Sequence, residues 1–112
     1  MQLKDFIKFI KKEDKRLREY YGNYKDEEKR ILARTVKLSE ELGELCDEVL
    51  SFNVMQRQDK LAKHDANNLS EEFADVIITT LLLAEVMNVD IEKALKHKMQ
   101  KINKRYKKRC GK

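Results

Sequence analysis

Hydrophobic residues lie on almost every side of the helix predicted over residues 69–87, LSEEFADVIITTLLLAEVM. At about 100° per residue, three separate faces of this helix are apolar, and only a helix surrounded by protein tolerates such a pattern. Two of its acidic residues, Glu72 and Asp75, lie three positions apart in the first turns and therefore point from one face. Ionised carboxylates are costly in these surroundings unless a cation lies opposite them. The pattern predicts a buried helix with a missing counter-ion.

Three further segments have the apolar spacing of amphipathic helices. The first covers about residues 3–21, and the second runs from about 26 to 52 or a few residues beyond. The last is predicted from 91 to about 108, with an apolar stripe that should face the core; this stripe consists of Ile91, Leu95, Ile102 and Tyr106. Residues 55–68 lose the periodicity, and at least the second half of this stretch is predicted as a loop.

Polar residues at the helix ends support these boundaries. Asn68, with Glu71 three residues later, is typical of a capping box, so the third helix should begin after Asn68. The same helix should end near Asn88. Asp90 is expected to cap the start of the last helix with its side chain.

The amino-acid composition indicates the fold class that these helices form. Proline is absent, glycine occurs three times and charged residues make up 40% of the 112 residues, which favours long helices over sheets. We expect an all-α, four-helix bundle-like fold that forms a single domain over residues 1–112, with 107–112 as a frayed tail.

Net charge and cysteine content indicate which cellular compartment and which kinds of partner to expect. The formal charge of +5 comes largely from the C-terminal end and permits anionic ligands. Cys46 and Cys110 show no CxxC spacing, and there is neither a signal peptide nor an apolar run of about 20 residues. These features predict a soluble, reduced, cytoplasmic protein without a membrane partner.

Three glutamates of the second helix, Glu41, Glu44 and Glu48, form an acidic strip beside its apolar stripe. If this strip faces Glu72 and Asp75, the carboxylates converge and repel, and protons or a cation must relieve the repulsion. Because the cluster offers only oxygen ligands, a hard cation such as Mg²⁺ is favoured. Glutamates at this spacing also occur on ordinary solvated helices, whereas ExxD in a helix that is apolar all round is rarer.

Two cations of the last helix, Lys98 and Arg105, fall within its apolar stripe in direction. One interpretation is that they pair with acidic residues of neighbouring helices or extend outward to solvent. The other is that they neutralise phosphate groups held at the carboxylate cluster, where the planar guanidinium of Arg105 suits phosphate oxygens. Asn103 falls off this inward face.

Two stretches carry a resemblance to a known family. KLSEELGELCDEVL (37–50) and SEEFADVIITTLLLAEVMNVDIEKAL (70–95) resemble the MazG-like nucleoside triphosphate pyrophosphohydrolases of the all-α NTP pyrophosphatase superfamily. The family signature is ExxE, a variable gap, and ExxD on the next helix. The resemblance covers roughly residues 33–106, and the 27 residues between Glu44 and Glu72 are at the long end of the family pattern.

The resemblance implies an activity and a set of site residues. The reaction would be hydrolysis of a nucleoside triphosphate, canonical or modified, to its monophosphate and pyrophosphate, as part of nucleotide pool cleaning. Mg²⁺, with Mn²⁺ as a substitute, would be held by Glu41, Glu44, Glu72 and Asp75. Glu48 would be an outer or additional ligand. One of these acids would act as base toward the attacking water instead of binding the metal directly, and Glu41 is our first choice for that role. The residues expected to hold the phosphates are Lys98, Asn103 and Arg105.

Association of copies is expected on two grounds. The third helix has more apolar surface than its neighbours in one chain easily cover, and exposed patches of that kind usually mark association. Members of the resembled family also assemble as dimers or dimers of dimers. We therefore predict a homodimer or a dimer of dimers.

Three other functions fit part of the pattern. Phosphoribosyl-ATP pyrophosphohydrolase, a related enzyme, shares the ExxE and ExxD arrangement. A non-enzymatic nucleic-acid-binding protein is suggested by the basic end KINKRYKKRCGK, but this stretch is short and has no aromatic residue besides Tyr106. A structural helical adaptor would leave Glu72 and Asp75 without a reason, and we rank it last.

Overall fold

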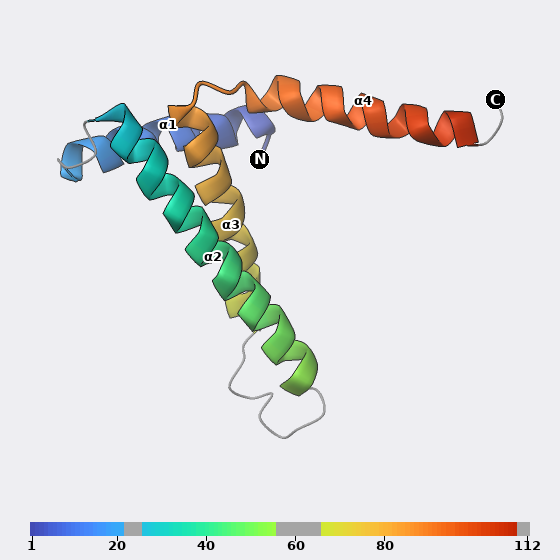
Figure 1. The fold of residues 1–112 in the computed structure, drawn as a ribbon, viewed down its shortest axis with the longest axis horizontal. Helices are drawn as coiled ribbons and strands as arrows, with labels where there is room; N and C mark the ends of the chain where they lie inside the picture. The colour runs from blue at the N-terminus through green and yellow to red at the C-terminus, as the bar shows by residue number, and fades with distance from the viewer. Residues whose placement is uncertain (22–25, 56–65, 110–112) are drawn as a thin grey trace.

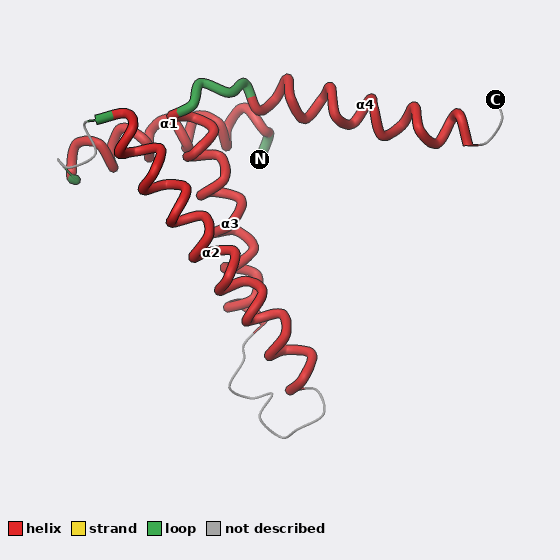
Figure 2. The backbone as a smooth tube through the Cα atoms, viewed as in Figure 1, coloured by secondary structure: helices red, strands yellow, loops and turns green. Residues whose placement is uncertain are grey.

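The computed structural model describes residues 1–21, 26–55 and 66–109, and every regular element in these ranges is a helix. The helices are α1 (Leu3–Tyr20), α2 (Glu27–Met55), α3 (Ala66–Val86) and α4 (Ile91–Arg109), shown in Figure 1. Figure 2 shows the same backbone by secondary structure, with no strand in the described part of the chain. The prediction of an all-α fold is confirmed.

An antiparallel pair formed by α2 and α3 is the centre of the fold, and α1 packs across α3 near its C-terminal end (Figure 1). The buried apolar side chains in the described ranges are Ile10 of α1 and Leu82 and Val86 of α3. The core therefore lies where α1 crosses this helix pair. The N-terminal half of α3, which carries Glu72 and Asp75, lies beyond the crossing.

The fourth helix extends away from the other three and approaches them only near its start (Figure 1). Leu95 is 45% exposed, Ile102 37% and Tyr106 62%, so the predicted inward direction of this stripe is wrong for a single chain. Helical periodicity identifies an apolar face, but it does not say whether the same chain covers it. The bundle within one chain thus consists of α1, α2 and α3.

The turn between α3 and α4 sets this direction. Asn88 has a positive φ of 57°, a left-handed conformation that asparagine tolerates and that commonly ends helices. The Val89 N–H donates to the Ala84 carbonyl at 3.0 Å. The Lys93 N–H donates to Asp90 Oδ1 at 3.1 Å, which confirms Asp90 as the cap of α4.

The start of α3 needs correction. Asn68 lies inside α3, which begins at Ala66, so the predicted N-cap at Asn68 is wrong. α2 ends at Met55, within the range predicted for it, and α4 includes residues 107–109 of the expected tail. Residues 110–112 of the expected tail lie outside the described residues. So do residues 56–65, which make up most of the predicted loop.

None of the helices in the described ranges is both long enough and apolar enough to cross a membrane.

Candidate metal centre

Three carboxylates from two helices converge beyond the core. Glu41 of α2 and Glu72 and Asp75 of α3 each offer one oxygen, and these oxygens all lie within 4.8 Å of one another. Glu41 reaches this point because it lies on the α2 face that packs along α3. Glu72 and Asp75 are brought together by their spacing of three on one helix. The structure thus brings together three of the four residues predicted as metal ligands.

Two oxygens of this cluster are buried without a hydrogen-bond partner. Glu41 is 7% exposed, and its Oε1 lies 3.1 Å from Lys37 Nζ. Its Oε2 and the Oε2 of Glu72 are buried and have no partner within the described residues. Buried carboxylate oxygens are rarely left in this state, because each loses its hydration without compensation. A cation that prefers oxygen ligands fits this set of carboxylates.

Charged side chains around the cluster raise the pKa values of Glu72 and Lys37. Burial raises the pKa of Glu72 above its ordinary value, and repulsion from Glu44, Asp75, Glu41 and Glu48 raises it further, in that order. The hydrogen bond to Glu41, followed by attraction to that carboxylate, raises the pKa of Lys37. These shifts indicate an accumulation of negative charge that favours protons or cations.

Glu44 and Glu48 lie at the border of the cluster. Glu44 is exposed and is not one of the three residues whose oxygens converge. Glu48 is half-buried. Both act on Glu72 through their charge. The predicted set of four ligands is therefore seen as three close carboxylates with two more acids nearby.

The predicted phosphate-binding residues do not lie beside this cluster in a single chain. Lys98, Asn103 and Arg105 are all exposed on α4, which extends away from α2 and α3 (Figure 1). The cation beside the cluster is instead Lys37, a residue for which we predicted no role. Its position four residues before Glu41 is the signal that could have identified it, because such residues are neighbours on a helix.

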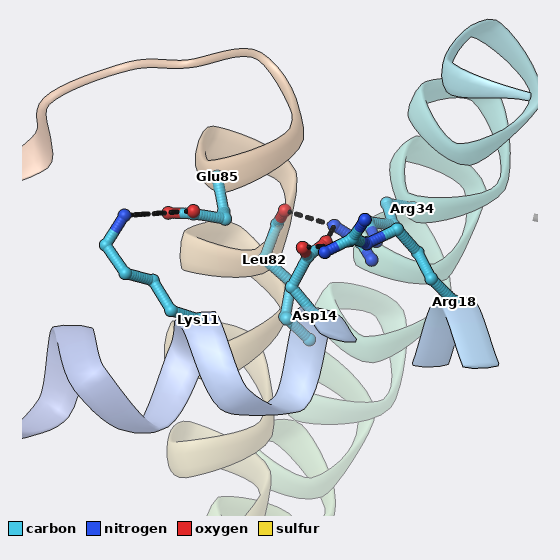
Figure 3. A network of polar contacts seen from close by, with 6 residues as sticks. All are labelled: Lys11, Asp14, Arg18, Arg34, Leu82 and Glu85. Atoms are coloured by element: carbon cyan, nitrogen blue, oxygen red, sulfur yellow. Dashed lines mark hydrogen bonds and ion pairs between the residues drawn. The ribbon is translucent and has the colours of Figure 1, made fainter. Parts of the chain in front are cut away.

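A second polar network lies at the crossing of α1 with the helix pair (Figure 3). Arg34 Nη1 donates to Asp14 Oδ1 at 2.7 Å and to the Leu82 carbonyl at 2.9 Å, which links α2 to both α1 and α3. Arg18 Nε also contacts Asp14, at 3.2 Å. Sequence reasoning missed this network. Its signal was the position of Arg34 in the apolar stripe, three residues after Ile31.

A pocket of about 690 Å³ lies between α1, α2 and α3. Its lining includes Leu17, Tyr21, Arg34, Lys37 and Leu82. Arg34 Nη2 is buried without a hydrogen-bond partner in the described part of the chain. The pocket has the size of a small-molecule site and combines apolar walls with a few polar groups. Lys37 lines the pocket and contacts Glu41, and it is the link between the pocket and the carboxylate cluster.

Comparison with known proteins agrees with this geometry. The family model of the MazG nucleotide pyrophosphohydrolase domain matches residues 29–110, which include all five acids of the site region. The chain is also 34% identical over 90 residues to the uncharacterized protein YpjD of Bacillus subtilis (strain 168), across 80% of this chain and 79% of that protein. No solved structure matches the chain. Because the family match spans well over half of the chain and confirms the resemblance to the family, this protein belongs to the MazG nucleotide pyrophosphohydrolase domain family.

Proposed function

We propose that this protein is a Mg²⁺-dependent nucleoside triphosphate pyrophosphohydrolase, which releases pyrophosphate and leaves the nucleoside monophosphate. The observation that carries this proposal is the convergence of Glu41, Glu72 and Asp75 with two buried oxygens that have no hydrogen-bond partner in the described ranges. Family membership supplies the reaction class, nucleotide pyrophosphohydrolysis. The cluster supplies a means of holding a cation beside a polyanionic substrate.

In this proposal, Glu41, Glu72 and Asp75 hold Mg²⁺, or Mn²⁺ in its place, and Glu44 and Glu48 contribute from the border of the cluster. The bound ion would neutralise charge on the phosphates and activate water. Glu41 accepts the proton of the attacking water. Lys37 supports this role, because its 3.1 Å contact to Oε1 holds the Glu41 carboxylate in one orientation.

The nucleoside is proposed to occupy the pocket of about 690 Å³ between α1, α2 and α3. Tyr21 and Leu17 offer flat and apolar surface to a base, and the buried Nη2 of Arg34 offers a donor to a base carbonyl. The phosphates would then pass Lys37 toward the carboxylates. We further propose that the protein acts as a homodimer or a dimer of dimers in the cytoplasm and removes unwanted nucleotides from the pool.

The test is pyrophosphate release from a panel of canonical and modified ribo- and deoxyribonucleoside triphosphates, with phosphoribosyl-ATP included, in the presence of Mg²⁺. We expect turnover of at least one nucleoside triphosphate and its loss in Glu72→Gln. Glu71→Gln is the matched control, because it makes the same change at the neighbouring, exposed residue and should retain activity. Circular dichroism checks that both variants remain helical. Full turnover in Glu72→Gln, or none by the wild type with either Mg²⁺ or Mn²⁺, would overturn the proposal.

A further inference from the structure

Arg34 uses one nitrogen of its guanidinium to hold the helices together and leaves another unused. Its Nη1 donates to Asp14 Oδ1 at 2.7 Å and to the Leu82 carbonyl at 2.9 Å. Its Nη2 has no hydrogen-bond partner within the described ranges, although the side chain is only 7% exposed. A buried donor is rarely left in this state, because it has lost its hydration without compensation. The unused donor is therefore suited to an acceptor that comes from outside the chain.

Arg34 also forms part of the wall of the pocket between α1, α2 and α3. The wall combines this side chain with the apolar residues Leu17, Ala33 and Leu82 and with the ring of Tyr21. A flat ring with a few polar atoms fits walls of this kind, because most of its surface is apolar and its edge needs only a few partners. The pocket and the unused donor thus form one candidate subsite for a heterocyclic base.

Residue positions along α2 and α3 indicate which part of a nucleotide lies beside Arg34. On α2, Lys37 lies four residues before Glu41 and Arg34 seven before it, which is about 6 Å and about 10.5 Å along the axis. The antiparallel α3 repeats this spacing, since the pocket residue Leu82 lies seven residues after Asp75. A nucleotide whose phosphates reach the carboxylates therefore has its sugar near Lys37 and its base near Arg34.

The charge balance of Arg34 favours an uncharged acceptor. Asp14 lies 2.7 Å from the guanidinium and offsets its charge, so Nη2 acts as a hydrogen-bond donor and not as a free cation. A carbonyl oxygen accepts N–H groups through two lone pairs, whereas an amino group on the base is itself a donor. Guanine, hypoxanthine, uracil and thymine carry a carbonyl at the ring position where adenine and cytosine carry an amino group. The donor at Arg34 matches the first group of bases.

We infer that the pocket selects nucleotides whose base has a carbonyl group at this position, and that Arg34 Nη2 donates to its oxygen. The inference rests on the proposed function, which makes the pocket the site of the base. An amino base would face the buried Nη2 with a second donor and leave both unpaired. That penalty is the usual source of strong discrimination in polar sites. Arg34 thus joins the helices through Nη1 and recognises the base through Nη2.

Two pairs of substrates that differ at this position test the inference. ITP and ATP share the purine ring, and UTP and CTP share the pyrimidine ring; one member of each pair has a carbonyl where the other has an amino group. With Mg²⁺ present, we expect kcat/KM for pyrophosphate release to be at least about tenfold higher for the carbonyl member of each pair that is hydrolysed. Equal values, or a preference for the amino member, would overturn the inference and leave the proposed function intact.

A sulfur substitution in the substrate examines the oxygen itself with the wild-type protein. In 4-thio-UTP a sulfur atom, a weak acceptor, replaces the oxygen at this position while the ring N–H is kept. We expect kcat/KM to fall from the value for UTP toward that for CTP. 6-Thio-ITP serves in the same way if only purines are hydrolysed. Undiminished turnover of the thio substrate would mean that no donor contacts the oxygen, and the inference would fail.

The variant Arg34→Lys assigns the preference to this residue. The lysine ammonium can still pair with Asp14, but it has no second nitrogen for the base. The preference within each substrate pair should fall below about twofold, through a loss for the carbonyl member. Arg30→Lys makes the same change one turn earlier, at a residue outside the pocket lining, and should keep the preference. Circular dichroism checks that both variants are folded. An unchanged preference in folded Arg34→Lys would overturn the inference, and the substrate comparisons decide it if this variant does not fold.

Binding of the reaction products is measured without any catalysis. Isothermal titration calorimetry should give a dissociation constant at least about tenfold lower for IMP than for AMP, or for UMP than for CMP. The difference should shrink in Arg34→Lys and persist in Arg30→Lys. If no triphosphate is hydrolysed, this measurement alone decides the inference. A difference in binding then means that the proposed function fails and the base preference stands, whereas its absence overturns the preference as well.

Discussion

Two groups of charged side chains lie at different points along the α2 and α3 pair, and they are built in different ways. At the crossing with α1, Arg34 binds Asp14 at 2.7 Å and the Leu82 carbonyl at 2.9 Å. Opposite charges therefore meet inside the chain. At the other group, Glu41, Glu72 and Asp75 have the same sign, and two of their oxygens are buried without a hydrogen-bond partner in the described ranges.

The difference separates a structural network from a ligand site. Asp14 and Arg34 neutralise each other's charge as soon as the helices pack, although Arg34 Nη2 has no hydrogen-bond partner in the described ranges, so their pairing contributes to the arrangement of α1, α2 and α3. The carboxylate cluster gains nothing from packing alone, because its members repel. Its stability depends on an ion from outside. The predictions below apply matched changes to both groups.

The largest effect is expected for activity at the carboxylate cluster. Asp75→Asn removes one charge from the proposed metal site and should lower pyrophosphate release by about 10²–10³-fold, because the phosphates lose electrostatic stabilisation. Its free energy of unfolding without metal should not fall, since repulsion is relieved. Steady-state kinetics and urea unfolding measure the two quantities. Near-normal turnover in this variant would remove Asp75 from the site.

The same substitution in the structural network should do the opposite. Asp14→Asn leaves the Arg34 guanidinium buried with its charge unpaired and should lower the free energy of unfolding by about 3 kcal/mol. Both side chains are largely buried, with exposed fractions of 12% for Asp14 and 7% for Arg34. Urea unfolding measures the change.

The double variant Asp14→Leu and Arg34→Met is the control for this assignment. Replacing both partners by apolar side chains removes the unpaired charge, so most of the lost stability should return. A double variant as unstable as Asp14→Asn would show that packing, and not charge pairing, explains the loss.

Addition of metal should stabilise the folded protein through the carboxylate cluster and not through the Asp14 and Arg34 network. Mg²⁺ at about 100 times its dissociation constant is expected to raise the free energy of unfolding by about 2.7 kcal/mol, since it binds the folded chain alone. Thermal unfolding with Mg²⁺ and with a chelator measures this gain. Glu72→Gln should lose it and Glu71→Gln should keep it. An equal gain in Glu72→Gln would place the ion elsewhere.

A smaller effect is expected from pH. The pKa of Glu72 is raised in the folded protein, so the folded state holds this proton more tightly than the unfolded chain does. This stabilising contribution is present below the ordinary glutamate pKa of about 4.3 and is lost as pH rises through the raised value. In chelator, the free energy of unfolding should therefore decline across this window. Urea unfolding at a series of pH values should show a flatter profile for Glu72→Gln, and identical profiles would contradict the assignment.

The smallest effect is expected from an exposed ion pair. Lys11 Nζ lies 3.0 Å from Glu85 Oε1 next to the structural network (Figure 3), but the lysine side chain is 60% exposed. Lys11→Met should change the free energy of unfolding by less than about 0.5 kcal/mol, because water screens such pairs. A loss near that of Asp14→Asn would mean that burial is a poor guide to the importance of these contacts.

Properties set by local spacing were predictable from the sequence. The helices, the cap at Asp90 and the pairing of Glu72 with Asp75 follow from periodicity and side-chain chemistry over a few residues. The start of α3 was placed too late, because Asn68 has the chemistry of a cap although the helix begins two residues before it. Helix ends are the least determined part of such patterns.

Properties that depend on which surfaces meet were harder to predict. Arg34 lies in an apolar stripe, but only the crossing of α1 shows that Asp14 meets it. Glu44 shares its motif with Glu41, yet its place on the wheel of α2 turns it to solvent. Lys98 and Arg105 were assigned to the inward side of a helix, but both are exposed in the described part of the chain. Periodicity defines faces, and tertiary contacts decide their partners.

A small rotation at the Asn88 turn produces a large displacement at the far end of α4. With 19 residues at 1.5 Å each, α4 is about 28 Å long, so a change of about 10° at the turn displaces its far end by about 5 Å. That displacement is close to the 5.4 Å rise of one helical turn. The backbone angles of three residues, Asn88 to Asp90, thereby control the alignment of charges many residues away.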